Sequence, residues 1–288
     1  MSSGAFEYGD AFSRNLGLVG PDEQKVVSET TVAIAGLGAV GGAHLVTLAR
    51  MGFQKFRIAD LDTYELANFN RQVGATLPTL DQAKVDVMRQ LVLEINPGAE
   101  VACFPQGVTA DNATEFLEGV DVAIDGLDYF AVDARLVFYR AARNARIPVV
   151  AAGPLGCSVA LLVFVPDGMS WEEYFAMDLA RSDLDRYVLF AVGTAPKGLH
   201  ISYIDRRYVD LERKRGPSLA PAVQLCAGAT GAEVMKLVLG RGPVYSAPYY
   251  QQFDAYKCRF TRGKLRWGNR GPMQRLKLWW VRRLVASI

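Results

Sequence analysis

Cysteine and histidine are scarce in this sequence of 288 residues. The cysteines are widely separated, no Cys-x-x-Cys pair occurs, and only two histidines could complete a ligand set; the six residues are Cys103, Cys157, Cys226, Cys258, His44 and His200. A structural zinc site takes four cysteine or histidine ligands at short spacings, and disulfide frameworks are typical of much shorter secreted chains. We therefore expect neither a zinc site nor a disulfide framework.

A strong charge excess, a leader segment and long apolar runs are also missing. Lysine and arginine total 32 against 30 aspartates and glutamates, so the formal charge of +2 offers no general attraction to nucleic acid. The first residues are polar and acidic, whereas a signal peptide begins basic and then turns apolar. No apolar run approaches the ~20 residues that cross a bilayer. These absences predict a cytoplasmic protein.

Glycine, in contrast, is concentrated in one stretch. Residues 32–42 read VAIAGLGAVGG, a short β-branched run that ends in a Gly-x-Gly-x-x-Gly turn before a helix-like segment. Gly36 permits the tight turn, Gly38 lets the backbone approach a phosphate, and Gly41 lets the helix pack closely on the strand. The helix then points free N–H groups and the positive end of its dipole toward the phosphate.

An acidic residue follows at the spacing that a nucleotide site requires. The apolar stretch 55–59 ends at Asp60, about 20 residues past the glycines, where a ribose-binding carboxylate belongs. The order of strand, glycine turn, helix, second strand and acid therefore predicts a nucleotide site. It does not state which nucleotide is bound.

Apolar strands alternate with amphipathic helices from residue 31 to residue 153. This alternation predicts an α/β fold with a doubly wound, Rossmann-like, mostly parallel sheet. Ligands of such sheets lie beyond the carboxyl ends of the strands, where the glycine loop, Asp60 and residues 126–128 fall. We expect strands at 31–36, 55–60, 99–104, 120–125 and 147–152, and helices at 41–51, 80–95, 111–118 and 131–145.

The chain after residue 154 has a different pattern. Additional strands are expected at 159–165 and 249–254 and a long helix at 221–239, whereas residues 166–220 show no clear period. A basic amphipathic helix is expected over 272–288, with an apolar stripe of Leu276, Trp280, Leu284 and Ile288. Such a helix docks on its own protein, on a partner or on an anionic membrane surface, and the pattern leaves these three open.

A glycine loop with a distal acid is found most often in nicotinamide dehydrogenases. Such an enzyme also needs an acid/base group, commonly a histidine. His44 lies on the helix just after the glycines, so His200 is the one candidate. An NAD-dependent oxidoreductase therefore stays open as an alternative, and so does a non-catalytic protein that keeps the nucleotide pocket as a scaffold.

The polar residues that follow Asp60 form a more specific set. The stretch contains Asn68-x-x-Arg71-Gln72, Lys84 lies at the start of the next helix, and residues 125–128 read DGLD after a strand. In order and spacing this set resembles the ThiF/MoeB/HesA family, the bacterial relatives of ubiquitin-activating enzymes. The resemblance covers residues 8 to about 153 and continues more loosely to about residue 242. It implies an adenylyltransferase that activates a carboxylate, usually the C-terminal glycine of a ubiquitin-like sulfur carrier protein.

The resemblance implies roles for individual residues. Asp60 would hold the ribose hydroxyls, Asn68, Arg71 and Lys84 would contact the phosphates, and Asp128 would hold Mg²⁺. The implied ATP-binding set is Gly36, Gly38, Gly41, Asp60, Asp62, Asn68, Arg71, Lys84 and Asp128; the implied catalytic set is Arg14, Arg71, Lys84 and Asp128. Arg14 would match the family's N-terminal arginine, which reaches into the site of the partner subunit, so a homodimer is implied as well.

The chemistry agrees with these residue types. An acyl adenylate forms when a carboxylate attacks the α-phosphate and pyrophosphate leaves, so positioning and charge neutralisation matter more than acid/base catalysis. Two arginines, a lysine and a metal-holding carboxylate supply both. This reaction needs no histidine.

The sequence also departs from the family pattern. Members often carry two Cys-x-x-Cys pairs for zinc, which are missing here, and many have an asparagine where this chain has Tyr129. No cysteine stands out as a thioester-forming residue, because Cys157 begins an apolar strand and Cys226 lies in an apolar helix pattern. The sequence thus predicts adenylation and leaves thioester transfer open.

Domains and partners follow from the same resemblance. We divide the chain into an N-terminal arm (1–29), a ThiF-type adenylation domain (30–256, with a nucleotide half 30–153 and a substrate half 154–256) and a basic tail (257–288). The expected substrate is a ubiquitin-like carrier protein or a peptide. A tRNA threonylcarbamoyladenosine dehydratase also activates a carboxylate and stays open; basic clusters at 206–207 and 213–215 and the tail could meet RNA, although the near-zero net charge disfavours it.

Overall fold

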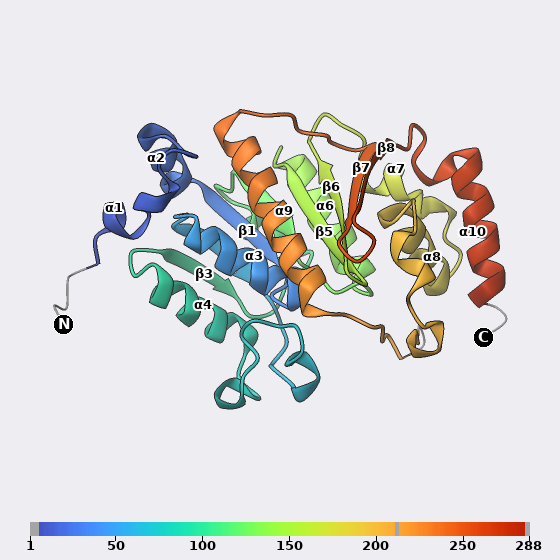
Figure 1. Cartoon of the computed structure of the whole chain (residues 1–288), viewed down its shortest axis with the longest axis horizontal. Coiled ribbons are helices and arrows are strands. Elements are labelled where there is room, and N and C mark those ends of the chain that lie inside the picture. Colours follow the sequence, from blue (N-terminus) through green and yellow to red (C-terminus); the bar gives the residue numbers. More distant parts are fainter. Residues whose placement is uncertain (1–5, 211–212, 286–288) are drawn as a thin grey trace.

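An eight-stranded sheet forms the centre of the molecule in the computed structural model, which describes residues 6–210 and 213–285 (Figure 1). The strands lie in the order β3-β2-β1-β4-β5-β6-β7-β8. Neighbours from β3 to β5 are parallel, and β5 to β8 pair antiparallel. Their bounds are β1 Thr31–Ala35, β2 Lys55–Ala59, β3 Glu100–Phe104, β4 Val122–Asp125, β5 Val149–Leu155, β6 Ser158–Phe164, β7 Tyr249–Asp254 and β8 Arg259–Lys264. The predicted α/β class with a mostly parallel sheet is confirmed.

Helices cover both faces of this sheet, as the alternating sequence pattern predicts. Helices α3 (Ala39–Arg50), α4 (Lys84–Ile95) and α9 (Ala220–Leu239) pack on one face with α2 (Pro21–Glu29). The other face carries α5 (Ala113–Phe116), α6 (Val132–Asn144), α7 (Trp171–Phe175) and α8 (Asp183–Thr194), and α10 (Pro272–Val285) packs on α8. The short elements are α1 Tyr8–Ala11, η1 Ser13–Asn15, η2 Leu66–Asn68, η3 Leu77–Thr79, η4 Met177–Leu179, η5 Leu199–Ser202, η6 Arg206–Tyr208 and η7 Gly268–Arg270.

The central strand β1 shows why the two faces differ. Side chains alternate along a strand, so Val32 and Ile34 face α3 and α9, while Ala33 and Ala35 face the other side. All four side chains are fully buried. This burial on both faces accounts for the unbroken apolar run in the sequence.

The order in which strands are added to the sheet reverses between β1 and β4. After β1 the strands β2 and β3 extend the sheet to one side, and β4 then returns to pair with β1 on the other. The last registered pairs join Ala35 with Ala59 and with Asp125. Gly36, Asp60 and Gly126, the residues that follow these three, therefore lie together at the switch point where such sheets bind ligands.

Helix α9 is the one element among the described residues that is long and apolar enough to cross a bilayer, with a mean hydropathy of 1.3. The prediction that no apolar run reaches the length needed to cross a bilayer is therefore wrong by length and composition. In the structure α9 packs against α3, β5 and β6, and Val223, Cys226 and Val234 are buried there. The buried side supplies most of the apolar residues of α9, and the exposed side adds small residues such as Gly228 and Ala232, which together account for its composition.

Three segments differ from their predicted structure. Helix α4 begins at Lys84 and not at residue 80, because Asp81 has a φ of +65°, which interrupts a right-handed helix. The predicted irregular stretch 166–220 contains α7 and α8, whose Ser170 and Ser182 side chains cap the first turns. Strand β8 lies within the predicted tail and completes the sheet. The division into domains stays a prediction.

Helix α10 confirms a C-terminal helix but not the predicted docking stripe. Leu278 is buried against α8, and Val281 packs beside it. Leu276 and Trp280 of the predicted stripe are exposed instead. The side chain of Leu284 and the whole of Ile288 lie outside the described residues. Helix α10 carries apolar residues on two sides, and spacing alone does not say which side packs on the protein, so docking of the predicted stripe on a partner or a membrane stays a prediction.

Candidate functional site

Three glycines form a close contact at the carboxyl ends of β1 and β4. Gly36 has a φ of +87°, and its N–H donates to the carbonyl of Ala59 at 2.7 Å. A β-carbon at Gly41 would overlap the carbonyl oxygen of Gly36, and one at Gly126 would lie 2.8 Å from the Cα of Gly41. No side chain fits at these positions, so the first and third glycines of the loop are required by packing.

Gly38 differs from these three glycines. A β-carbon there would have Gln72 Nε2, at 3.9 Å, as its nearest neighbour, so the backbone of Gly38 faces open space. Gly38 also forms the N-cap of α3, without a side chain to cap the first turn. Free N–H groups at a helix start with open space before them are suited to a phosphate.

Asp60 links the glycine loop to the end of β2. Its Oδ2 accepts the N–H of Leu37 at 2.6 Å and its Oδ1 accepts the N–H of Asp62 at 2.9 Å. Burial raises the pKa of the Asp60 carboxyl, and these two N–H groups partly oppose that shift. The two bonds fix the carboxylate at the edge of the sheet, and each oxygen keeps one lone pair that a ribose hydroxyl can use.

Lys84 is held at the start of α4 with its side chain almost fully buried. Its Nζ pairs with Asp62 Oδ2 at 3.0 Å, and its backbone N–H donates to the carbonyl of Asp62 at 3.0 Å. The Asp62 side chain is mostly exposed, so the pair lies at the rim of the site. An ammonium group in this position can exchange a carboxylate partner for a phosphate.

Asn68 is the last residue of η2, and Arg71 lies on the turn that follows. Asn68 is buried and its Oδ1 accepts the N–H of Glu65 at 3.1 Å. Arg71 folds back on this turn, where Nη1 donates to the carbonyl of Ala67 and to Asn70 Oδ1 at 2.7 and 2.8 Å. Next to it Gln72 is buried, and its Oε1 has no hydrogen-bond donor in the described part of the chain. The Nε2 of the same amide lies 3.9 Å from the position that a β-carbon of Gly38 would take, so Gln72 adds a polar group to the site.

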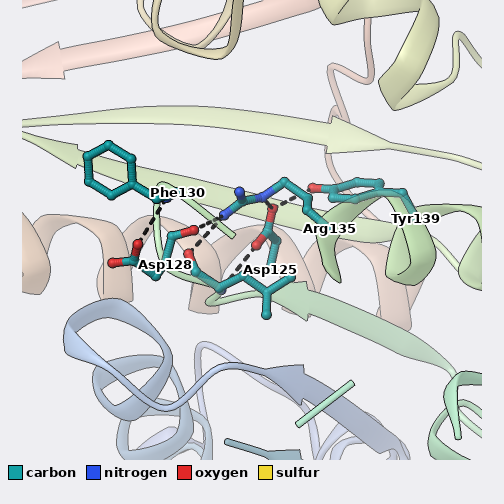
Figure 2. A network of polar contacts seen from close by, with 6 residues as sticks. Asp125, Asp128, Phe130, Arg135 and Tyr139 are labelled. Carbon is teal, nitrogen blue, oxygen red and sulfur yellow. Dashed lines mark hydrogen bonds and ion pairs between the residues drawn. The ribbon is translucent and has the colours of Figure 1, made fainter. Parts of the chain in front are cut away.

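Asp125, the last residue of β4, and Asp128, three residues later, have opposite environments (Figure 2). Asp128 is exposed, and its Oδ1 accepts the N–H of Phe130 at 2.9 Å. Asp125 is buried and accepts from Arg135 Nε at 2.8 Å, Tyr139 Oη at 3.1 Å and the N–H of Leu127 at 3.1 Å. Asp128 is therefore available to a ligand, and Asp125 is fully engaged in the protein.

Arg135 links the Asp125 carboxylate to the backbone of the loop that carries Asp128. Besides its bond to Asp125, its Nη2 donates to the carbonyls of Leu127 and Asp128 at 2.8 and 3.1 Å (Figure 2). Phe190 of α8 covers the guanidinium, whose Cζ lies 4.5 Å from the ring centroid. The arginine thus holds the backbone of the loop that carries Asp128.

Tyr129, which stands where many relatives have an asparagine, fixes the same loop from outside. Its hydroxyl donates to the carbonyl of Tyr187 on α8 at 2.6 Å, and its ring packs against Phe130 and Phe190. Burial raises the pKa of the Tyr129 hydroxyl well above its usual value, so it stays a donor. With a tyrosine at this position in place of an asparagine, the Asp128 loop is hydrogen-bonded to α8.

Arg14 does not lie in the site of its own chain. It belongs to η1, and the neighbouring Asn15 donates to the carbonyl of Met51 at 2.9 Å, just past the end of α3. Helix α3 has 12 residues, so at 1.5 Å per residue its two ends are about 18 Å apart. The glycine loop is at the opposite end of this helix from Arg14.

The histidines and cysteines lie outside the site. His44 is completely buried on α3, both ring nitrogens lack a partner within the described residues, and burial lowers its pKa to about 3. His200 lies on η5 near Asp254, where burial also lowers its pKa. Cys226 is buried in the core and Cys157 is half-buried before β6. None of these four belongs to the glycine loop or to the Asp128 loop.

Arg135, Asp125, Tyr139 and Gln72 are the site residues that sequence reasoning missed or left out. Arg135 and Tyr139 are four residues apart on the amphipathic α6, which is the spacing of one helix face. An arginine on a helix face is usually exposed, so the sequence offered no signal for its burial. Gln72 had a signal, because it directly follows Arg71 in the polar motif.

The profile of the ThiF family matches residues 12–271 of the chain. A tRNA threonylcarbamoyladenosine dehydratase of Bacillus subtilis is 36% identical over 118 residues, which are 41% of this chain and 46% of that protein. A sulfur carrier protein adenylyltransferase of Thermus thermophilus is 29% identical over 123 residues, which are 42% and 45% of the two chains. The chain thus spans about half the length of these curated relatives.

Solved structures share the fold over more of the chain. The crystal structure of PaaA matches 92% of this chain and 85% of its own, with a TM-score of 0.69 and 19% identity. The crystal structure of Escherichia coli MccB with ATP matches 88% of this chain and 69% of its own, with a TM-score of 0.65 and 16% identity. At these identities the likeness concerns the fold.

Proposed function

The chain belongs to the ThiF family, and we propose that it is an ATP-dependent adenylyltransferase that activates a carboxylate. In this reaction a carboxylate oxygen of the substrate bonds to the α-phosphorus of ATP. The bond from that phosphorus to the bridging oxygen breaks, and pyrophosphate leaves with the electron pair. The product is an acyl adenylate.

The observation that carries this proposal is the grouping of the polar residues at one edge of the sheet. The open turn at Gly38, the Asp60 carboxylate and the exposed Asp128 follow the adjacent strands β1, β2 and β4. Lys84 and Arg71 bring positive charge to the same edge from the segment after β2. Neither histidine belongs to this group, and phosphate chemistry of this kind needs charge and position above all.

Each group has a defined task in this scheme. The N–H groups at the start of α3 and the Lys84 ammonium bind phosphate oxygens, and Asp60 orients the ribose. Arg71 leaves its contacts with Ala67 and Asn70 to neutralise charge that develops on the leaving pyrophosphate. Arg135 acts indirectly, because it positions the loop that carries Asp128.

We also propose Mg²⁺ as a cofactor, with Asp128 as its protein ligand. Its carboxylate is exposed and, among the described residues, only Oδ1 is hydrogen-bonded, so an oxygen is available to a hard cation. Mg²⁺ usually keeps several waters and binds one or two carboxylates together with substrate phosphates, which a single aspartate at a phosphate site fits. The ion would supply charge neutralisation to the phosphates.

The proposed activity is tested by nucleotide binding and by ATP–pyrophosphate exchange. Calorimetry should show Mg-ATP binding that weakens in Asp128→Ala. With a sulfur carrier protein as the carboxylate, exchange should be lost in Arg71→Ala and Lys84→Ala and retained in Arg89→Ala, an exposed position on the same helix α4. Exchange at the normal rate in both site variants would refute the assignment.

A homodimer in which Arg14 serves the site of the partner subunit is part of the same proposal. Leu16 and Leu18 are exposed beside Arg14, and Leu61, Leu66 and Leu77 are exposed around the site. Two apolar surfaces, one near the arginine and one near the site, are suited to meet across a two-fold axis. Mixing the inactive variants Arg14→Ala and Asp128→Ala should restore up to about a quarter of the exchange activity, since some mixed dimers then hold one intact site.

The substrate can also be a modified tRNA base, because the Bacillus subtilis relative is named a tRNA threonylcarbamoyladenosine dehydratase. Both substrates pass through an activated carboxylate, so the ATP site does not distinguish them. AMP release that depends on threonylcarbamoyladenosine-containing tRNA, and not on a carrier protein or peptide, would select this second candidate. Tight NADH binding that is indifferent to Asp128 would favour an oxidoreductase instead. We place the protein in the cytoplasm.

A further inference from the structure

The charge of the chain is divided very unevenly. Residues 255–288 contain ten lysines and arginines and no aspartate or glutamate, whereas the whole chain has a formal charge of +2. The rest of the chain therefore carries a formal charge of −8. The near-neutral net charge is thus the sum of a basic C-terminal segment and an acidic remainder of the chain. The basic segment includes α10.

Helix α10 has two apolar sides. The inner side packs on α8 through Leu278 and Val281, and Gln274 is buried there with its amide donating to the carbonyl of Val192 at 3.1 Å. Because α10 is already fixed to the body by these contacts, its outer residues are not needed for docking on the protein itself.

The outer side combines large apolar side chains with arginines. Leu276 is 59% exposed, Met273 64% and Trp279 50%. The guanidinium of Arg283 stacks on the Trp279 ring, with Cζ 4.0 Å from the centroid. Arg275 flanks this face, and neither Arg275 nor Arg283 has a carboxylate partner in the part of the chain that the structure describes.

The position of α10 makes this face accessible. The helix lies at one end of the molecule, and the N-terminal helices α1 and α2 lie at the other (Figure 1). The main contacts of α10 in the described chain are with α8 and η7, and Leu276, Trp279 and Arg283 are exposed. A large flat partner could therefore reach the helix without meeting the rest of the protein.

The combination of apolar side chains and arginines on this face indicates which kind of partner it can bind. Phosphate groups of a nucleic acid would satisfy the arginines but would leave Leu276 and Met273 in water. A second copy of the same face would bring Arg275 and Arg283 against their own equivalents. An anionic lipid bilayer offers headgroup phosphates to the arginines and an acyl boundary to the leucine, methionine and tryptophan, which is how interfacial helices bind.

We propose that the outer face of α10 docks the protein on anionic membrane surfaces. The inner side keeps the helix on α8, Leu276 and Trp279 enter the headgroup boundary, and Arg275 and Arg283 contact anionic headgroups. The ATP site lies elsewhere on the molecule and is unaffected by this contact.

The test is co-sedimentation of the full chain with large vesicles of phosphatidylcholine alone or with 30% phosphatidylglycerol. We expect binding to the anionic vesicles at 0.1 M salt that falls at least 10-fold at 0.5 M, and little binding to the neutral vesicles. Leu276→Gln and Arg283→Gln should each weaken binding by about 10-fold. The matched controls Val26→Gln and Lys25→Gln, exposed on α2 at the other end, should not.

A second measurement separates insertion from simple adsorption. Vesicles with brominated acyl chains should quench the tryptophan fluorescence of the wild type, and Trp279→Gln should remove much of that quenching. Each variant should keep the wild-type unfolding transition, because the substituted side chains are exposed. Binding to single-stranded RNA but not to vesicles, or salt-sensitive self-association that Leu276→Gln abolishes without vesicles, would overturn the proposal, as would equal binding by wild type and Leu276→Gln.

Discussion

On the β1 side of the candidate site, glycines and backbone N–H groups make the contacts, whereas on the β4 side a buried arginine makes them. Gly36 and Gly41 touch through main-chain atoms, and Asp60 is held by two backbone N–H groups. On the other side, Arg135 reaches from α6 to bond one carboxylate and two carbonyls. One side depends on the absence of side chains and the other on a single long one.

This difference predicts how each side fails. The glycine side has no room for an added atom, so its failure is steric and abolishes the loop. The β4 side contains an ion pair that is buried at both ends, so its failure leaves an unpaired charge in the interior. The exposed Asp128 belongs to neither case, because its removal affects the ligand more than the fold.

Substitutions of two loop glycines should give the largest contrast. Gly41→Ala places a methyl group on the carbonyl of Gly36, so we expect a loss of at least about 3 kcal/mol of unfolding free energy and no detectable Mg-ATP binding. Gly38→Ala meets no atom closer than 3.9 Å, so it should fold with a loss below about 1 kcal/mol and weaken Mg-ATP binding alone. Urea unfolding and calorimetry measure both; equal stability of the two variants would contradict the packing argument.

Breaking the buried pair should give the next largest effect. Arg135→Met leaves Asp125 buried without its partner, and we expect a loss of about 3–5 kcal/mol in urea unfolding. The double variant Arg135→Met with Asp125→Leu removes both charges and should recover most of that loss. Arg186→Met, which breaks the exposed pair with Asp133, is the control and should cost less than about 1 kcal/mol. A double variant no more stable than Arg135→Met would show that the ion pair is not the cause.

Asp128→Asn should separate activity from stability. We expect ATP–pyrophosphate exchange to fall about 100-fold, because a charge that faces the phosphates is lost. The unfolding free energy should change by less than about 0.5 kcal/mol, since the side chain is exposed and bonds one N–H. Asp133→Asn, another exposed aspartate just after this loop, should change neither. A large loss of stability would mean that Asp128 has a structural role like that of Asp125.

His44 should give the smallest effect at neutral pH, and its contribution becomes visible as a dependence of stability on pH in acid. Its pKa is lowered from 6.5 to about 3 by burial, so the unfolded chain binds a proton that the folded chain does not between these values. The neutral histidine is fully compatible with folding above pH 6.5, and stability falls as the pH drops below that value, by up to about 1.4 kcal/mol per pH unit. The difference in unfolding free energy between wild type and His44→Met should show this slope between pH 6 and pH 4. A flat difference would show that His44 is protonated or hydrated in the folded state.

The parallel part of the fold followed closely from the sequence, and the helices after β6 did not. Strands β1, β2 and β4 are short apolar runs bounded by glycine or acid, and these signals are local. Helices α7 and α8 lie in a stretch where aromatic and charged residues mix, since Tyr174 and Tyr187 are buried among other aromatic rings. The helical periodicity of α7 and α8 is hard to recognise in the sequence, because tyrosine and tryptophan carry both an apolar ring and a polar group and do not indicate whether a position is buried or exposed.

By itself the sequence determined the glycine turn, the acid at Asp60 and the order of polar motifs, because each depends on neighbours within a few residues or on fixed spacing. Only the tertiary structure decided that Arg135 is buried beneath the Asp128 loop, that Arg14 lies at the far end of α3 from the glycines, and which side of α10 faces α8. Those facts depend on elements that meet only after folding. The sequence of a helix does not show which element each of its faces will pack against, because that element is brought to the helix only by folding.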